Sequence, residues 1–371
     1  MFPSPEYVGQ APSAPAGTGA GAGPGPQEHG RLGAIVEGEA SVTSAMQTVQ
    51  TVQTVRGAVE AASLGRVLMH EHLFIVTHDY WLNHPDRQGF DEERDVAEAI
   101  RALNELKAAG IDTIVDLTVM GQGRFLPRVQ RVAAQTELNI VAATGLYAYS
   151  SLPMPFHYQG PGAMLEGPEP LTELFVGDIV DGIAGTGVKA GVIKCSTDAP
   201  GMLPEIERAV RAAARASVQT GAPISTHTDA AAQTGTAQLR VFQEEGVQLS
   251  RVVIGHSGDT EDIDYLVSLL ATGASVGMDR FGTDFPLTTQ QRVDVVAELC
   301  RQGFSQQIVV SHDAAVFNDF TPVPLMRALA PEWGYTFIPR VLPGKLQQAG
   351  LSEAEIDDIL VANPRRVLAG A

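Results

Sequence analysis

Six residues of the types that bind divalent metal ions stand where short apolar runs of this chain end. They are His70 and His72 in VLMHEH, Lys194 in GVIKC, His227 in ISTHT, His256 in VVIGHS and Asp313 in IVVSHD. Imidazole at such positions suits zinc, iron, manganese or cobalt, and the carboxylate adds an oxygen ligand. Because parallel strands that close into a barrel bring their carboxyl ends together, we expect these side chains to form one site.

The spacing of His70 and His72 places both side chains on the same face of a strand, toward the barrel interior. Glu71, between them, is then expected to point outward to the helices. A His-x-His pair is a weak indication by itself, since a single histidine is more often structural than a ligand. The complete set favours the ligand interpretation.

Lys194 is the least expected member of the set. A lysine buried beside cations loses hydration and meets like charge, and both effects favour the neutral amine. A neutral amine can take up CO2 to form a carbamate, an anion able to bridge two metal ions. The alternative, a surface lysine with its head group in solvent, fits poorly because Gly191, Val192 and Ile193 precede it; Lys189 is the better candidate for that role.

The elements that must position these residues alternate along the chain. Segments with helical periodicity, such as 93–110 and 203–221, each end at a glycine and separate the apolar runs. The predicted strands are 66–72, 111–118, 139–147, 190–196, 222–228, 251–257, 274–280 and 307–313. Strand and helix in strict alternation predict an α/β fold, a parallel TIM (β/α)8 barrel, because closure is needed to bring the last strand beside the first.

The amino-terminal residues have a different composition. Gly, Pro, Ala and Ser dominate residues 1–45, which predicts a disordered extension; a partner-binding tail is the alternative. Residues 46–371 are expected to form the barrel domain. At its start, VQTVQTV (49–55) alternates valine with polar residues and predicts an edge hairpin.

Composition limits the partners. Lys and Arg number 25 against 43 Asp and Glu, a net charge of −18, which disfavours nucleic acid and anionic lipid. There is neither an apolar run of about 18 residues nor a secretory signal pattern, so a cytoplasmic location is expected. Cys195 and Cys300 lie in apolar stretches and are expected to be buried thiols.

These residues carry a resemblance to the phosphotriesterase family of the amidohydrolase superfamily, from about Thr51 to Leu368. The resemblance implies that His70, His72 and Asp313 hold one metal ion and that His227 and His256 hold the other. It also implies that Lys194, as N6-carboxylysine, bridges the two and that the protein is a homodimer. Zinc is expected first, with iron, cobalt or manganese as alternatives.

A mechanism follows from two such metal ions. They lower the pKa of a bridging water, so that hydroxide is available near neutral pH to attack a carbonyl or phosphoryl centre. Asp313, ligand and carboxylate at once, is expected to take the hydroxide's proton.

Two residues favour a lactone as the substrate. Arg280 in GMDRFG resembles the lactonase branch of the family; it is expected to hydrogen-bond Asp313 and Asp259, as a catalytic relay or as simple charge neutralisation. Tyr147 occupies a position where lactonase-like members carry a tyrosine that orients the lactone. Tyr149 could take that role instead, or simply pack. Asp279 is expected to brace its strand end.

Other residues near these strand ends receive weaker interpretations. Phe317 and Phe320 follow the last strand and are expected to form an apolar wall for an acyl chain. His78, His84 and His157 are in loops and are more typical of structural or solvated positions, although His157 could form part of a lid. His312 is expected to face the helices as a structural hydrogen-bonding residue.

Three hypotheses about function follow. The first is a lactonase for N-acyl homoserine lactones or related γ- and δ-lactones, with weak phosphotriesterase activity. The second is a dedicated organophosphate triesterase or another ester hydrolase of the family. The third is a metal-binding protein without turnover that acts through its amino-terminal tail. The complete ligand set with Asp313 weighs against the third.

Overall fold

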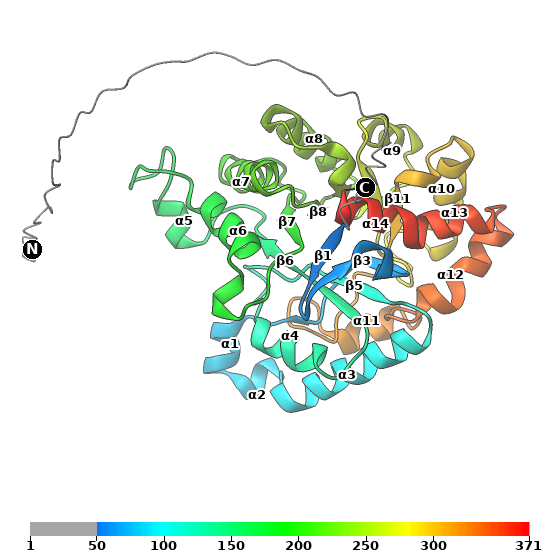
Figure 1. Ribbon diagram of the computed structural model, residues 1–371, viewed down its shortest axis with the longest axis horizontal. Helices are drawn as coiled ribbons and strands as arrows, with labels where there is room; N and C mark the ends of the chain where they lie inside the picture. Colours follow the sequence, from blue (N-terminus) through cyan, green and yellow to red (C-terminus); the bar gives the residue numbers. More distant parts are fainter. Residues whose placement is uncertain (1–49, 371) are drawn as a thin grey trace, which may run out of the picture. The chain divides into compact units, whose positions relative to one another are not determined.

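The structure is a computed structural model that describes residues 50–370. The disordered extension predicted for residues 1–45 therefore lies outside the described residues. Within them, the chain forms one barrel and the segments that cover it (Figure 1).

Eight parallel strands form the central sheet, and their order in the sheet follows their order in the chain. The strands are β3 (Val67–Glu71), β5 (Thr113–Asp116), β6 (Asn139–Gly145), β7 (Val192–Ser196), β8 (Ile224–His227), β9 (Val252–Ile254), β10 (Ser275–Met278) and β11 (Ile308–Val310). Each lies within one of the predicted runs, so the (β/α)8 barrel is confirmed. Their residues are buried on both faces because helices cover the outside of the sheet.

The first and last strands meet at a seam. The backbone N–H of His72 donates to the carbonyl of Ala314 at 2.9 Å, and that of Asp313 donates to the carbonyl of His70 at 3.1 Å. The N–H of His70 also donates to Ser311 Oγ at 2.8 Å. These bonds bring the end of β11 beside the end of β3, as the ligand set requires.

Helices follow the strands along the chain and bury an apolar face on the sheet. They include α3 (Glu92–Ala108), α4 (Leu126–Ala133), α6 (Pro170–Val180), α7 (Pro204–Thr220), α8 (Thr234–Glu245), α9 (Ile263–Leu270), α10 (Thr289–Arg301) and α12 (Phe337–Gln348). The two helices predicted in most detail are α3 and α7. Gly221 ends α7 in a left-handed conformation with φ +74°.

Shorter elements complete the barrel's ends. They are β1 (Thr51–Thr54), β2 (Gly57–Glu60), β4 (Phe74–Ile75), α1 (His78–Asn83), α2 (Pro85–Gln88), α5 (Met154–Tyr158), β12 (Phe317–Asn318), α11 (Val323–Leu329), α13 (Glu353–Asp357) and α14 (Asn363–Ala369), with several single turns of helix. The predicted hairpin is confirmed as β1 paired antiparallel to β2. Val52 of the hairpin and Val367 of α14 pack with Val67 in one buried cluster.

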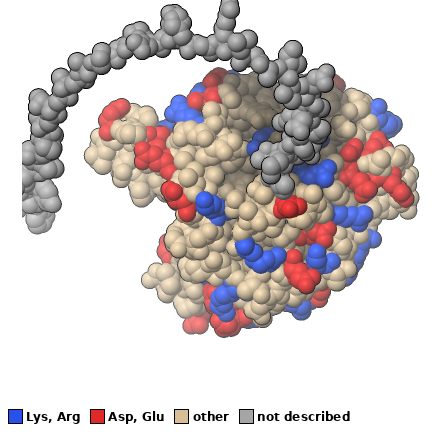
Figure 2. Space-filling view, in the orientation of Figure 1, with Lys and Arg blue, Asp and Glu red and all other residues tan. Residues whose placement is uncertain are grey.

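Charged side chains of both signs are interspersed on the face of the described residues seen in Figure 2, where acidic and basic groups alternate. Among residues 50–370, we find no helix long and apolar enough to cross a membrane. Cys195 and Cys300 are buried free thiols, as expected.

One glycine permits a close approach of strands beside the lysine. Gly145 has φ +133° and pairs with Lys194 in the sheet; a Cβ there would stand 1.8 Å from the Lys194 carbonyl oxygen. We expect Gly145→Ala to lower the free energy of unfolding by about 1–3 kcal/mol, because overpacking forces the strands apart. Denaturant unfolding measures the effect.

Gly177→Ala is the matched control. Gly177 lies in α6 with open space around its Cα, and alanine there is expected to be neutral or stabilising by up to about 1 kcal/mol. If the two variants have equal free energies of unfolding, the close approach of the strands at Gly145 does not require glycine, and the prediction is wrong.

Candidate metal centre

A cavity of about 890 Å³ opens at the carboxyl ends of the barrel strands. All of the residues predicted from the sequence as ligands or catalytic groups line it: His70, His72, Tyr147, Lys194, His227, His256, Arg280 and Asp313. The structure therefore brings all eight side chains together at one end of the barrel.

One cluster consists of His70, His72 and Asp313. The Nε2 atoms of His70 and His72 lie 3.6 Å and 3.3 Å from Oδ1 of Asp313. The three ligand atoms are close enough together to bind one metal ion. His70 lies on β3 and His72 directly follows its end, and both rings face the cavity, as their two-residue spacing predicted.

The second cluster contains His227 and His256, whose Nδ1 and Nε2 atoms are 2.8 Å apart. The outer nitrogen of each ring is next to a carboxylate: His227 Nε2 is 2.7 Å from Asp198, and His256 Nδ1 is 2.9 Å from Asp279. Burial lowers the pKa of His227 to about 4 and holds the pKa of His256 well below its usual value, so both rings are neutral near pH 7.

A neutral imidazole has one N–H, and in these rings the carboxylates take it. The two nitrogens that face each other therefore both present lone pairs. Two lone pairs at this distance repel, and a cation between them removes the repulsion. The donor set of His227 and His256 thus fits a divalent metal ion.

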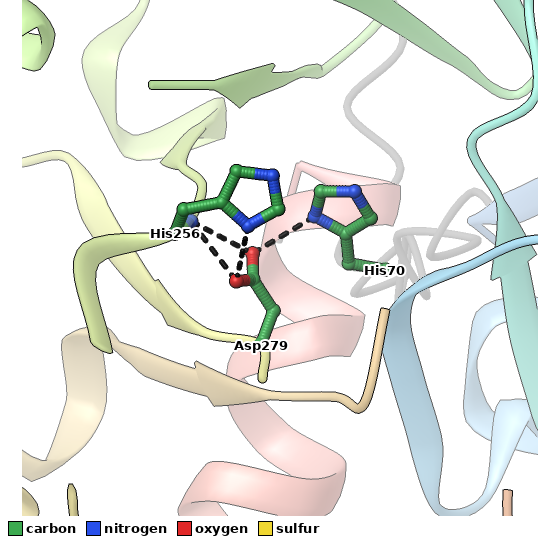
Figure 3. A group of neighbouring side chains, drawn as sticks. All are labelled: His70, His256 and Asp279. Carbon is green, nitrogen blue, oxygen red and sulfur yellow. Dashed lines mark hydrogen bonds and ion pairs between the residues drawn. The ribbon is translucent and has the colours of Figure 1, made fainter. Parts of the chain in front are cut away.

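Asp279 connects the two clusters (Figure 3). Its carboxylate accepts hydrogen bonds from Nδ1 of His70 at 2.8 Å, from Nδ1 of His256 at 2.9 Å and from the backbone N–H of His256. Burial by itself would raise the pKa of Asp279, but the two histidines outweigh it and hold the pKa well below the usual range. Asp279 does brace its strand end, as predicted, and it also sets which nitrogen of each ring faces the cavity.

Lys194 is fully buried, as its sequence context predicted. Its Nζ lies 2.8 Å from Nε2 of His70 and 3.3 Å from the carbonyl oxygen of Thr226. Burial lowers the pKa of Lys194 to about 8. About a tenth of the amine is therefore neutral at pH 7.

Arg280 makes both of the hydrogen bonds expected of it. It donates through Nε to Asp313 at 3.2 Å and through Nη1 to Asp259. Arg292, a fully buried residue that the sequence did not bring to attention, donates to the other oxygen of Asp259 at 2.9 Å. Both carboxylates that face Arg280 are thus held in fixed positions.

Tyr147 and Tyr149 lie together beside the second cluster. Their phenols hydrogen-bond one another, and the Tyr149 oxygen is 3.4 Å from Nε2 of His227. Burial, followed by the negative charge of Asp313, raises the pKa of Tyr147. The phenol is therefore protonated at neutral pH and can donate a hydrogen bond.

Two acceptors behind the histidines were missed at the level of sequence. Asp198 accepts from His227, and Thr118 lies 2.9 Å from Nδ1 of His72. Asp198 stands four residues after Lys194, in the loop that leaves the same strand end, and this placement could have identified it. Thr118 gave no such signal.

The expectation for Phe317 was wrong. Phe320 lines the cavity and stacks on Tyr147, with ring centres 6.2 Å apart. Phe317 instead lies in β12, pairs with Phe74 of β4 and packs on Phe90 at 5.0 Å. Because neighbouring strand residues alternate in direction, pairing with β4 fixes Phe317 against the outer core.

His78, His157 and His312 agree with their structural interpretation, although His78 and His157 lie in the short helices α1 and α5 rather than in loops. His78 packs on Phe125, and Nδ1 of His157 lies 2.5 Å from a carboxylate oxygen of Glu205. His312 is buried and accepts the backbone N–H of Ile338 at Nε2, at 2.9 Å. None of these three rings is among the residues that line the cavity.

Comparison with known proteins agrees with this geometry. A sequence profile described as the phosphotriesterase family matches residues 50–368. The chain belongs to the phosphotriesterase family. It is a metal-dependent hydrolase of that family, and its clustered histidines and carboxylates could bind metal.

Several relatives match over nearly their whole length. The phosphotriesterase homology protein of Mycobacterium tuberculosis is 53% identical, with 84% of this chain and 95% of that protein covered. The aryldialkylphosphatase of Saccharolobus solfataricus is 36% identical, with 84% and 97% covered. A solved structure of the phosphotriesterase from Mycobacterium tuberculosis matches with a TM-score of 0.84 and 52% identity, over 86% of this chain and 98% of that one. The N-acetyltaurine hydrolase of Tetraodon nigroviridis is more distant, at 28% identity with 85% and 96% covered.

The position of Asp279 yields a prediction about metal affinity. An asparagine there keeps the size but offers one acceptor oxygen and an unwanted donor to two imidazole N–H groups. We expect Asp279→Asn to weaken zinc binding by about 10–100-fold, as loss of a ligand's supporting carboxylate does elsewhere. Competition with a chelator of known affinity measures it.

Asp264→Asn serves as the control for the charge change. Asp264 is exposed on α9, away from the cavity-lining residues. The zinc affinity of the Asp264→Asn variant is expected to equal that of the unmodified chain. Equal affinity in the Asp279 variant would contradict the orienting role.

Proposed function

We propose that this chain opens lactones, of the N-acyl homoserine or related γ- and δ-lactone class, at a centre of two divalent metal ions. Weak phosphotriesterase activity is expected alongside. The observation that carries the proposal is a protonated phenol, Tyr147, beside the ligand cluster in a cavity whose guanidinium is already paired with carboxylates.

The charges of the cavity favour an uncharged substrate. Four carboxylates line it, and the guanidinium of Arg280 is hydrogen-bonded to two of them. Among the residues that line the cavity, the guanidinium is already paired and the proposed carbamate removes the positive charge of Lys194, so a substrate with its own carboxylate, sulfonate or phosphate charge finds no unpaired cation there. Asp198, Asp229, Asp259 and Asp313 are the four carboxylates. A lactone is neutral and fits this environment.

The chain's donor set fits two metal ions. His70, His72 and Asp313 would hold one and His227 and His256 the other, with Lys194 as N6-carboxylysine shared between them. Zinc is the expected metal, with iron, cobalt or manganese possible for these ligand types. When bound, such ions supply Lewis acidity and lower the pKa of a coordinated water.

The chain's own groups would orient the lactone and move a proton. The Tyr147 phenol donates a hydrogen bond to the lactone's oxygen as negative charge develops there. Asp313 accepts the proton released in the attack, and the hydrogen bond from Arg280 keeps its carboxylate turned into the cavity. Phe320 and Tyr147 together give the acyl chain an apolar surface.

A second candidate is a dedicated organophosphate triesterase or other ester hydrolase. It is favoured by the 36% identity to an aryldialkylphosphatase. A phosphotriester is also neutral, so the cavity charge does not separate it from a lactone. Hydrolysis of an anionic amide, suggested by the relatives named N-acetyltaurine hydrolase, agrees less well with four cavity carboxylates.

A direct comparison of substrates tests the proposal. Protein loaded with zinc or cobalt in the presence of bicarbonate is assayed with C4 to C12 N-acyl homoserine lactones and with paraoxon. We expect kcat/KM for at least one lactone to exceed that for paraoxon by ~10-fold or more. The reverse order would favour the triesterase, and no turnover of either above that of Asp313→Asn would reject both.

Asp313→Asn tests proton transfer. An amide can still offer an oxygen to a metal ion but cannot accept the proton at neutral pH. We expect metal content to persist and kcat to fall by about 10²–10⁴-fold, the usual contribution of a positioned acid or base. Metal analysis of the same sample as the kinetics is the measurement, and full kcat with full metal content would exclude the role.

The pKa of Lys194 predicts a pH dependence of activation by CO2. Its value of about 8 means that the reactive neutral amine rises as pH increases through that value. Between pH 7 and pH 9, the initial rate of reactivation of metal-free protein by zinc and a fixed concentration of dissolved CO2 should rise ~10-fold. The His227 pKa of about 4 leaves that ring neutral throughout this interval.

Lys194→Met controls for effects of pH on metal binding alone. The methionine variant has no amine, so its reactivation should not depend on CO2 at any pH. A CO2 response in this variant, or a rate in the unmodified chain that is flat from pH 7 to 9, would contradict the carbamate.

A further inference from the structure

We propose that Glu71 is the positioning residue that holds Asp313 in place against His70, His72 and Arg280. This inference rests on the proposed function, since Asp313 is the proton acceptor of that reaction. Glu71 is fully buried between the two histidines on β3, and it is absent from the residues that line the cavity. Its carboxylate therefore acts through the backbone.

The carboxylate of Glu71 accepts four hydrogen bonds from residues that directly follow β11. Oε1 accepts from Ser311 Oγ at 3.0 Å, from the backbone N–H of His312 at 3.0 Å and from Nδ1 of the His312 ring at 2.7 Å. Oε2 accepts from the backbone N–H of Ala314 at 2.9 Å. The donors lie on both sides of Asp313 in the chain, so the carboxylate binds the backbone immediately before and after that residue.

Asp313 needs such support because its backbone is in the left-handed region, with φ +53°. A non-glycine residue adopts that conformation at a cost and keeps it where its surroundings enforce it. The left-handed residue turns the N–H groups of its two neighbours, His312 and Ala314, to the same side, where they form a small anion-binding concavity. Glu71 fills this concavity, and the Asp313 side chain projects the other way, into the cavity.

The remaining bonds of the seam make the arrangement rigid. The N–H of Asp313 itself donates to the carbonyl of His70, so three consecutive backbone N–H groups have partners on β3. On the outer side, Trp333 Nε1 donates to the carbonyl of His312 at 3.0 Å. The position of Asp313 relative to His70 and His72 is thus set by the residue between those two histidines.

The main test is Glu71→Gln, which keeps the volume of the side chain. One oxygen becomes an NH2 group, which meets a backbone N–H where an acceptor is required. With two cobalt ions per chain verified, we expect the visible absorption of the cobalt protein to change in position or intensity, because the Asp313 carboxylate shifts. We also expect kcat for the lactone to fall about 10–100-fold with KM changed less than about 3-fold.

Glu92→Gln is the matched control. Glu92 forms an ion pair at 2.7 Å with the buried Arg128, so its loss lowers stability at a place remote from Asp313. Its cobalt spectrum and kcat should match the unmodified chain at temperatures well below unfolding. A Glu71 variant that loses stability but, like Glu92→Gln, keeps its spectrum and kcat would overturn the proposal.

Ser311→Ala provides a second, milder variant if Glu71→Gln does not fold. It removes one of the four donors, together with the acceptor of the His70 backbone N–H, and should change the cobalt spectrum in the same direction, to a smaller degree; an unchanged spectrum would overturn the proposal. The spectrum requires no substrate. If the unmodified chain turns over no lactone, the proposed function fails, while the positioning role of Glu71 is still decided by the spectra.

Discussion

A buried imidazole can bind a cation only through a nitrogen that carries no proton, and this site depends on acceptors that take the proton at the other nitrogen. Asp279 does so for His70 and His256, and Asp198 does so for His227. Burial keeps the pKa of each of these rings low, so the rings stay neutral. Lone pairs then face the cavity from several strands at once, and the cluster becomes able to bind a divalent cation.

Buried carboxylates also set the backbone at two ligand positions. His256 and Asp313 both have positive φ. Asp279 accepts the backbone N–H of His256 itself, and Glu71 accepts the N–H groups of the residues on either side of Asp313. Left-handed backbone costs about 1–3 kcal/mol per residue, which is comparable with what charge-assisted hydrogen bonds contribute. The strand ends are therefore held in the geometry of the site by the same kind of group that orients the ligands.

Electrostatics connects this arrangement to the choice of substrate. The carboxylates that support histidines and Arg280 leave the cavity acidic, and the paired guanidinium is not free to bind an anion. Bound divalent cations would offset much of that negative charge and would be used in the chemistry rather than in recognising a charged group. This balance favours the neutral ester proposed as substrate, and the phenol of Tyr147 adds a donor suited to a carbonyl oxygen.

The sequence by itself determined the barrel and the predicted ligand and catalytic residues that line the cavity. Burial on both faces of a parallel strand requires an apolar run, and several of these runs end in a residue that can bind metal. It also indicated the hydrogen bonds of Arg280. The tertiary structure decided that Asp198, Thr118 and Glu71 support this site and that Phe317 turns away from it. The contacts of Thr118, Glu71 and Phe317 depend on which strands and loops become neighbours in the fold, and no local pattern of residues encodes such long-range pairing. Asp198 had a local signal, its place after a strand end, but its partner His227 lies on the next strand.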